Sequence, residues 1–332
     1  MEFIKICNSK GMSALISPLG ASISSLFVPD RLEKLRDIVL GFDSPQMYGK
    51  NDKYFGAAIG RYANLISSGT FILSGRKIEL SRNYGDHHLH GGFEGFSSVI
   101  WDIAQENKNS VILENIFPDG KDGYPGNLKV SLEYLINEKN GIEIKWNAVS
   151  DADTIASFTN HSYFNLLGHD SQTLKDHTVQ IKSDYFLPIK SDFTPIGEIR
   201  SVSGGPMDFR EPKEILKDIF SKDEQMALGS GYDHNYVLSA DFNEASASVV
   251  CKESGIKMSI FTTQPGMQFY SDNDPAEIKG KGGAVYRGRG AICFETQSFP
   301  DAPNHNNFPS AILKEGHLYT HITEYRFETL TN

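Results

Sequence analysis

The amino-acid sequence predicts an all-β protein, a large antiparallel β-sandwich with few short helices. Apolar and polar residues alternate with a period of two in several stretches, which is the pattern of strands with one buried face. Helical periodicity is rare, and Gly, Pro and Asn separate the alternating stretches as they do in turns. No Pro- or Ser-rich linker and no internal repeat interrupts the 332 residues, so we expect residues 1–332 to form a single domain.

The expected strands recur from one end of the chain to the other. The stretch FILSGRKIEL (71–80) predicts two short strands around a Ser-Gly turn. LKVSLEYL (128–135) and GIEIKWNAV (141–149) alternate apolar and polar residues, and LYTHITEYRFETL (318–330) does so near the C-terminus. We expect all of these segments to be half-buried strands.

The clearest helical signal is EPKEILKDIF, residues 211–220. Pro212 stands near a plausible first turn, where its missing N–H is tolerated. Four apolar residues follow at the spacing of one helix face: Ile215, Leu216, Ile219 and Phe220. We therefore expect a short helix here, with this stripe packed against the core.

Composition and charge limit the partners of the chain. Lys and Arg number 32 against 42 Asp and Glu, and the formal net charge is −10. Basic residues are scattered, so nucleic acid and anionic membrane surfaces are not expected partners. The N-terminal segment lacks the pattern of a secretion signal, and no apolar run is long enough to span a bilayer. Together with three widely spaced cysteines, Cys7, Cys251 and Cys293, these features predict a cytoplasmic protein with reduced, buried thiols.

Three histidines crowd the segment YGDHHLHGGFEGF, residues 84–96. His88 and His90 are two residues apart, so an extended backbone projects both to one face, where Asp86 or a distant carboxylate completes a metal site. Against this interpretation, the segment has no H-x-x-x-H helix and no Cys ligand. We expect no metal here and assign His87 and His88 to a turn.

Two other segments carry candidate acid–base groups. Proton-transfer chemistry needs a carboxylate and an imidazole that face each other across a small pocket. Glu295 follows three apolar residues on a strand that enters the core. Taken alone, this position fits a functional carboxyl and a surface glutamate at a strand end equally well. In TNHSYFNLL, an extended backbone places His161, Tyr163 and Asn165 on one face, as in a wall that binds a sugar. The alternative for His161 is a hydrogen-bonded core histidine.

Six segments, taken together, resemble the aldose 1-epimerases, also called galactose mutarotases. They are GRYAN (60–64), LHGG (89–92), NHSYFNL (160–166), DHNYVL (233–238), TTQPGMQFY (262–270) and ETQSFPDAPN (295–304), in the order found in the family. The resemblance implies one large sandwich of the galactose mutarotase type, the supersandwich. It implies an isomerase that interconverts the α and β anomers of aldoses such as galactose and glucose. The expected partner is a small-molecule sugar, no cofactor is needed, and the oligomeric state is left open.

The resemblance also implies roles for individual residues. Glu295 is expected to be the general base that takes the proton from the anomeric hydroxyl, and His161 the general acid that protonates the ring oxygen. His90 is expected to hydrogen-bond near that oxygen and to assist proton transfer. The residues expected to hold the sugar are Asn64, Arg61, Asp233 and Gln268. If Gln268 faces the site, strand alternation predicts that Tyr270 does too, and Phe269 does not.

One position departs from the family pattern. The family usually reads ANRI, whereas this chain reads ANLI with Leu65, and the missing arginine contacts the sugar in relatives. Its loss removes a charged donor, and Arg61, which matches the other arginine of the motif, is not assumed to replace it. We expect activity, with an altered substrate preference or affinity.

Two alternatives remain open. A non-catalytic sugar-binding protein on the same fold keeps the hydroxyl contacts but does not need both Glu295 and His161. A metal-dependent sugar isomerase uses the histidine-rich segment, and metal analysis of the purified protein distinguishes it.

Overall fold

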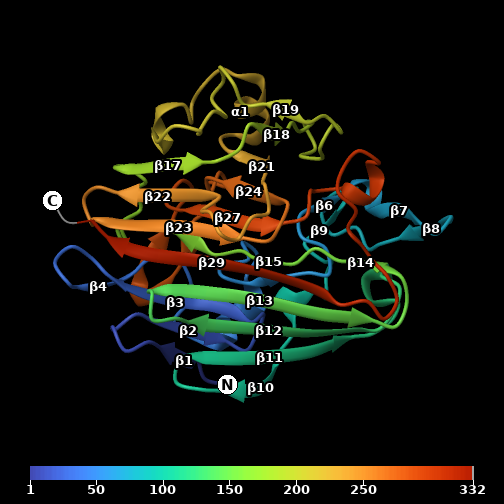
Figure 1. The fold of residues 1–332 in the computed structure, drawn as a ribbon, viewed down its shortest axis with the longest axis horizontal. Helices are drawn as coiled ribbons and strands as arrows, with labels where there is room; N and C mark the ends of the chain where they lie inside the picture. The colour runs from blue at the N-terminus through green and yellow to red at the C-terminus, as the bar shows by residue number, and fades with distance from the viewer. Residues whose placement is uncertain (331–332) are drawn as a thin grey trace.

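The computed structural model describes residues 1–330, and most of its regular structure is strand (Figure 1). Within these residues the largest sheet has nine strands, each antiparallel to its neighbours. In spatial order they are β10 (Asp102–Glu106), β11 (Ser110–Phe117), β12 (Leu128–Ile136), β13 (Gly141–Ser150), β29 (Tyr319–Thr329), β23 (Ile256–Thr262), β22 (Ala247–Cys251), β17 (His177–Ile181) and β20 (Lys213–Glu214).

Two further sheets pack with this one. The six-stranded sheet has the order β16 (Tyr163–Phe164), β27 (Ile292–Gln297), β24 (Gly266–Tyr270), β21 (Asp233–Val237), β18 (Tyr185–Leu187) and β19 (Arg200–Ser201). The four-stranded sheet has the order β1 (Ile4–Cys7), β2 (Ser13–Ser17), β3 (Ser22–Pro29) and β4 (Leu35–Asp37).

Short elements connect the sheets. The strand pairs are β5 (Ala58–Ile59) with β15 (Thr159–Asn160), β6 (Leu65–Ile66) with β9 (His88–Leu89), β7 (Thr70–Leu73) with β8 (Arg76–Glu79), β14 (Thr154–Ile155) with β28 (Ile312–Leu313), and β25 (Ile278–Lys279) with β26 (Val285–Tyr286). The helical turns are η1 (Pro45–Lys50), η2 (Ser67–Gly69), η3 (Phe96–Ser98), η4 (Lys121–Gly123), η5 (Ile215–Lys217), η6 (Lys281–Gly283) and η7 (Ala302–Asn304), and the α-helix is α1 (Glu224–Gly229).

The alternating stretches form strands as predicted. On β12, the side chains of Leu128, Val130, Leu132 and Tyr134 are fully buried, while Lys129 is exposed. The C-terminal strand β29 lies between β13 and β23 and so joins the two halves of the nine-stranded sheet (Figure 1). Residues 71–80 form the predicted pair of short strands, β7 and β8.

A shared core joins the three sheets into a sandwich. One buried apolar cluster contains Ile23 of the four-stranded sheet, Leu132 of the nine-stranded sheet and Phe294 of the six-stranded sheet. Tyr325 on β29 donates a hydrogen bond of 2.6 Å from its hydroxyl to the main-chain oxygen of Phe294 on β27. These contacts fix the face of the six-stranded sheet that points away from the core, which is the face that carries the site. The predicted β-sandwich is confirmed.

The predicted helix at residues 211–220 is wrong. This segment forms β20, at the edge of the nine-stranded sheet, and the single turn η5. Ile215 and Ile219 are buried as expected, but Phe220 is 73% exposed. The α-helix begins instead at Glu224, after Asp223, whose carboxylate accepts hydrogen bonds from the main-chain N–H groups of Gln225 and Met226. The N-cap residue Asp223 was therefore a better indicator of the helix position than the spacing of apolar residues in 211–220.

Three smaller expectations have mixed outcomes. Cys251 and Cys293 are buried free thiols, but Cys7 is only partly buried. In residues 1–330, no helix has the length and apolar character needed to cross a membrane. That residues 1–332 form one domain stays a prediction.

Candidate active site

A small pocket of about 190 Å³ opens on the six-stranded sheet. Three neighbouring strands of that sheet supply part of its polar lining: Asp233 from β21, Gln268 and Tyr270 from β24, and Glu295 from β27. Loop residues supply the rest of the polar lining, and they are Asp52, Lys53, Asn64, His90, His161 and Asp274. Gln268 and Glu295 are cross-strand partners, and so are Asp233 and Tyr270. The expected alternation holds, because Tyr270 lines the pocket with Gln268 whereas Phe269 is fully buried in the core.

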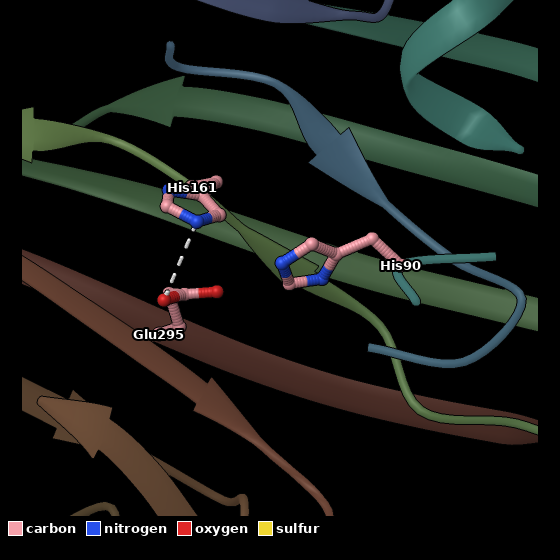
Figure 2. Close-up of side chains that lie close together, drawn as sticks. All are labelled: His90, His161 and Glu295. Atoms are coloured by element: carbon pink, nitrogen blue, oxygen red, sulfur yellow. Dashed lines mark ion pairs between the residues drawn. The ribbon is translucent and has the colours of Figure 1, made fainter. Parts of the chain in front are cut away.

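His161 and Glu295 face each other across this pocket (Figure 2). His161 lies in the irregular link between β15 and β16, and its Nε2 is 3.6 Å from Glu295 Oε1. That separation is too long for a good hydrogen bond, so neither atom is committed to the other. The second carboxyl oxygen, Glu295 Oε2, is buried and has no hydrogen-bond partner in the described part of the chain. Both groups are thus free to act on a ligand.

The main chain of Asn64 fixes the protonation pattern of His90. Its N–H donates a hydrogen bond of 3.1 Å to Nδ1 of His90. A neutral imidazole has one acceptor nitrogen and one N–H, so the proton of His90 sits on Nε2. Figure 2 shows the His90 ring pointing toward the space between His161 and Glu295. His90 therefore presents an N–H donor to whatever occupies the pocket.

Burial shifts the pKa values of these groups toward their neutral forms. Loss of hydration raises the pKa of Glu295 well above its usual value, with the nearby Asp233 carboxyl as a second cause. Loss of hydration also lowers the pKa of His161 to about 4 and holds the pKa of His90 well below its usual value. Glu295 is thus a stronger base than a free carboxylate, and protonated His161 is a stronger acid than a free imidazolium.

His90, His161 and Glu295 also have the composition of a metal site. One donor atom from each lies within 4.8 Å of the other two, and two imidazoles with a carboxylate are a common ligand set. Metal-binding histidines, however, usually donate their second ring N–H to an acceptor, whereas His90 Nδ1 accepts from Asn64. A metal would find Nδ1 occupied and Nε2 protonated, so this trio does not fit a metal without a change at His90.

The other sequence-predicted sugar contacts divide into two groups. Asp233 accepts a hydrogen bond of 2.7 Å at Oδ1 from the Gln268 amide, and loss of hydration raises the pKa of Asp233 to about 6. Gln268 Oε1 is buried without a partner in residues 1–330, and Asn64 also lines the pocket. These three residues present polar groups to the pocket.

Arg61 does not line the pocket. Its guanidinium donates hydrogen bonds to the main-chain oxygens of Phe117, Pro118 and Pro125 and lies over the Tyr124 ring. Because these contacts use the guanidinium to hold the 117–125 loop, we exclude Arg61 from the sugar-binding set predicted from the sequence. Leu65, where the sequence resemblance led us to expect arginine, does line the pocket, beside its cross-strand partner Leu89.

The remaining histidines of the 84–96 segment have structural contacts. His88 is fully buried on the short strand β9, and its Nε2 lies 2.6 Å from the Tyr124 hydroxyl, so its assignment to a turn is wrong. His87 lies 3.5 Å from the Asp192 carboxylate through Nε2 and accepts a hydrogen bond from the main-chain N–H of Ser68. His90 has φ of 51°. The extended backbone that a metal pair of His88 and His90 would require is therefore absent.

The predicted wall after Asn160 is partly wrong. His161 and Tyr163 line the pocket, but Asn165 does not. The Asn165 amide donates hydrogen bonds to the main-chain oxygens of Thr173 and Gly290. Because His161 lies outside both β15 and β16, strict alternation does not apply across these five residues.

The sequence reasoning missed Tyr84, Tyr54 and Phe193 among the aromatic residues that line the pocket. Tyr54 packs edge-on against His90, with ring centroids 4.8 Å apart, and stacks on His161 at 6.0 Å. Phe193 reaches the pocket from the loop after β18. Tyr54 and Phe193 have positive φ, 58° and 65°, and lie outside the regular strands and the matched motifs. No alternation or motif signal pointed to them.

Comparison with known proteins gives one consistent result. The family model described as aldose 1-epimerase matches residues 2–326. Galactose mutarotase from Bos taurus is 41% identical over 310 residues, 93% of this chain and 89% of the relative. Aldose 1-epimerase from Escherichia coli is 34% identical over 330 residues, 98% of this chain and 95% of the relative.

Solved structures agree with the sequence relatives. An aldose epimerase homologue from C. elegans superposes with a TM-score of 0.92 at 31% identity and covers 99% of both chains. Galactose 1-epimerase from Lactobacillus acidophilus superposes with a TM-score of 0.84 at 27% identity, over 98% of this chain and 93% of that chain. These matches confirm the fold and the enzyme class expected from the motifs, and the chain belongs to the aldose 1-epimerase family.

Proposed function

We propose that the chain interconverts the α and β anomers of hexoses such as galactose and glucose, with Glu295 as general base and His161 as general acid. The observation that carries this proposal is the facing pair itself. His161 Nε2 and Glu295 Oε1 lie 3.6 Å apart in one small pocket, and neither is held by the other. The anomeric hydroxyl and the ring oxygen are bonded to the same carbon, so the two groups that act on them must also be close together.

Each turnover moves two protons and changes no oxidation state. Glu295 takes the proton from the anomeric hydroxyl while His161 gives a proton to the ring oxygen, and the bond between the ring oxygen and the anomeric carbon breaks. The open aldehyde rotates about the adjacent carbon–carbon bond and presents its other face. Protonated Glu295 and neutral His161 then run the transfers in reverse. No redox cofactor or phosphate takes part in this sequence.

The pocket favours these transfers because it buries both the base and the acid. The raised pKa of Glu295 and the lowered pKa of His161 each increase the driving force for transfer in the assigned direction. The same burial keeps the empty site in its neutral form, with the shared proton on Glu295. When substrate binds, sugar hydroxyls and the Nε2–H of His90 donate hydrogen bonds that shift this proton from Glu295 toward His161.

Asn64, Asp233 and Gln268 are proposed to hold the remaining hydroxyls. The unpartnered Gln268 Oε1 is an acceptor for one of them, and Asp233 offers carboxyl oxygens beside it. Tyr270 and Tyr54 line the same pocket with aromatic surface. Leu65 supplies an apolar contact where relatives usually have arginine, so we propose a sugar preference that differs from theirs.

Polarimetry of freshly dissolved α-galactose and α-glucose tests the proposal. Wild-type protein is expected to accelerate the drift in optical rotation, and Glu295→Gln and His161→Asn are each expected to reduce kcat by about 10²- to 10⁴-fold. Circular dichroism checks that both variants stay folded. The ratio of the two sugars measures the effect of Leu65.

A different result separates the alternatives. If wild-type protein binds the sugars in calorimetry but does not accelerate the drift, it is a sugar-binding protein and the proposed chemistry is wrong. If activity depends on a metal found in the purified protein, the metal-dependent isomerase is correct. We also propose a cytoplasmic location, since all three cysteines are free thiols, as is usual in reducing compartments.

A further inference from the structure

Two tyrosine rings stack on the ring of His161. The Tyr163 ring is tilted by 18° from the plane of the imidazole, with the ring centroids 5.0 Å apart. The Tyr54 ring is tilted by 23°, with the centroids 6.0 Å apart. The ring nitrogens have neighbours of another kind, because Glu295 Oε1 lies 3.6 Å from Nε2 and Cys293 Sγ lies 3.6 Å from Nδ1. The nitrogens of the imidazole thus face polar groups, while tyrosine rings lie nearly parallel to its plane.

We propose that Tyr163, and more weakly Tyr54, stabilise the protonated form of His161 through the electron-rich faces of their rings. Both are positioning residues, because they act through His161 and not on the reacting atoms of the sugar. This inference rests on the proposed function, in which the doubly protonated imidazole gives a proton to the ring oxygen. The sequence predicted Tyr163 only as part of a sugar-binding wall and did not point to Tyr54.

The attraction between a cation and an aromatic face fits this geometry. A cation over a tyrosine ring is attracted to the negative charge of the π system when it lies within about 6 Å of the ring centre, and both tyrosines meet that distance. The attraction is larger where water is excluded, and His161 and Tyr163 are only 5% and 3% exposed. A neutral imidazole lacks the charge, so the tyrosines favour the protonated ring.

This preference helps the acid because the protonated ring is the scarce form of His161. Burial lowers the pKa of His161 to about 4, so few molecules carry the acid at neutral pH. A stabilised imidazolium is more abundant but a weaker acid, and the rate of proton transfer loses only part of that acidity. The gain in abundance is therefore larger than the loss in acid strength. In the reverse step the same attraction helps neutral His161 to take its proton back.

Packing holds the Tyr163 ring in place. Phe55 meets Tyr163 edge-on, with ring centroids 4.9 Å apart, and Tyr286 meets Phe55 edge-on at 5.5 Å. All three rings belong to one buried apolar cluster. Tyr54 is only partly buried and lies farther from the imidazole. We therefore expect a larger effect from Tyr163 than from Tyr54.

The charge of His161 is measured most simply in Glu295→Gln without sugar. This variant removes the carboxyl whose titration is coupled to that of His161. The other titratable groups around the imidazole are Cys293, His90 and Tyr270. Burial holds the pKa of His90 well below its usual value and raises the pKa of Cys293 and of Tyr270. All three stay neutral at pH 4, so a charge that appears there belongs to His161.

The ¹⁵N chemical shifts of the His161 ring at pH 4 give its protonated fraction. About half of the ring is expected to be protonated in Glu295→Gln, since the pKa is about 4. Addition of Tyr163→Leu is expected to reduce the fraction to about one-tenth, because the pKa falls by about one. Tyr54→Leu should reduce it to about one-quarter. Tyr163→Phe keeps the ring face and should leave the fraction near that of Glu295→Gln.

Activity with Glu295 in place is expected to follow the same order. Tyr163→Leu should lower kcat by about two- to tenfold, less than the fall in the protonated fraction allows, and Tyr163→Phe should stay within about twofold of wild type. Tyr319→Leu is the matched control. Tyr319 is also buried and meets a histidine, His321, edge-on at 4.8 Å, but it lies outside the pocket. This variant should change neither kcat nor the protonated fraction of His161.

The direction of the change decides between stabilisation and simple burial. If the tyrosines only shield His161 from water, their loss hydrates the ring and the protonated fraction rises, which overturns the proposal. An unchanged fraction in Tyr163→Leu and Tyr54→Leu overturns it too, as does a fall in Tyr163→Phe as large as in Tyr163→Leu. If Tyr163→Leu does not fold, Tyr54→Leu gives the same test at a partly exposed position.

The proposed function can fail separately. If wild-type protein proves inactive on every aldose, the assigned chemistry is wrong. The protonated fraction is measured without sugar and in a variant that lacks the base, so it still shows whether the tyrosines stabilise the His161 cation.

Discussion

The nine-stranded and six-stranded sheets obey the same alternation but use their second face differently. On β12 the apolar residues, such as Leu132, face the core, and Lys129 is exposed. On β24 and β27, Phe269 and Phe294 face the core, but the alternate residues Gln268 and Glu295 are only 5% and 2% exposed. Polar side chains that are buried without partners cost stability. The pocket-facing side of the six-stranded sheet therefore lowers the free energy of unfolding. Gln268 Oε1 and Glu295 Oε2 on that side have no hydrogen-bond partner among the described residues.

A pair of substitutions is expected to separate the two sheets most strongly. Glu295→Gln should lower kcat by about 10²- to 10⁴-fold, because it removes the base. It should not lower the free energy of unfolding, because it removes a buried ionisable group. Leu132→Ala on the nine-stranded sheet should cost about 2–5 kcal/mol of unfolding free energy, because it leaves a cavity in the shared core, with kcat within about twofold of wild type. Urea unfolding and polarimetry measure the two quantities on the same samples.

The contrast between the two sheets fails if either substitution changes both kcat and the free energy of unfolding. A Glu295→Gln variant that loses several kcal/mol would mean that the carboxyl stabilises the fold. A Leu132→Ala variant that loses most of its activity would mean that the pocket depends on packing in the distant core. Either result would contradict the view that the nine-stranded sheet provides stability while the six-stranded sheet provides activity.

The pH dependence of the free energy of unfolding is expected to show how much burial of the Asp233 carboxylate destabilises the fold. Its pKa is about 6 in the fold, against about 3.9 for an unperturbed Asp. Between these values the folded state binds more protons than the unfolded state, so stability falls as pH rises through this window. Asp233→Asn lacks this titration and should be more stable than wild type at pH 7, by at most about 3 kcal/mol. The difference should narrow as the pH is lowered to 4.

Urea unfolding of both proteins between pH 4 and pH 7 measures this difference. Asp102→Asn, at an exposed position on β10, controls for the loss of one negative charge and should show no such trend. A wild-type protein that is equally or more stable than Asp233→Asn at pH 7 would contradict a raised pKa for Asp233.

Much of the fold was readable because alternation is a local signal. On β12 and β13 the apolar residues of the alternating pattern are buried as expected, whereas β29 buries Thr323, Glu324 and Tyr325 in a row. The helix expected at 211–220 failed because Pro212 leads into the edge strand β20, which pairs with β17. Pairing with a strand more than thirty residues away overrode the local apolar spacing, and no local pattern carries that information.

The orientation of site residues could be predicted from alternation only where those residues lie on strands. Glu295, Gln268 and Tyr270 follow from alternation once one of them is known to face the pocket. Tyr54 and Phe193 come from irregular loops with positive φ, and their positions depend on how distant loops meet. The wrong prediction that Arg61 binds the sugar has the same cause. The main-chain oxygens that bind its guanidinium belong to residues 117–125, which are distant in the sequence. The sequence shows the arginine but not these acceptors.

The rim of the pocket is expected to affect binding more than chemistry. His87 Nε2 lies 3.5 Å from Asp192 Oδ2, next to Phe193, whose ring meets Tyr84 edge-on at 6.4 Å. His87→Ala should loosen this loop and raise KM by at most about fivefold, since a pair at the protein surface contributes about 1 kcal/mol or less, with kcat unchanged. Lys257→Ala, which breaks an exposed pair with Glu328 elsewhere, should change neither constant. A fall in kcat with unchanged KM would instead place His87 in the chemistry.

The smallest expected effect is at Leu65. This side chain is 3% exposed and lies beside Leu89 in the pocket wall. Leu65→Arg introduces the donor that the sequence resemblance led us to expect here, and its hydrogen bonds to sugar hydroxyls should lower KM. Burying the guanidinium costs most of that gain, so we expect a change of only about two- to threefold in KM and a shift in the galactose-to-glucose ratio. Leu65→Met, which keeps the apolar contact, should leave both values unchanged. A higher KM for Leu65→Arg would show that Asn64, Asp233 and Gln268 already hold the sugar in a position that an arginine disturbs.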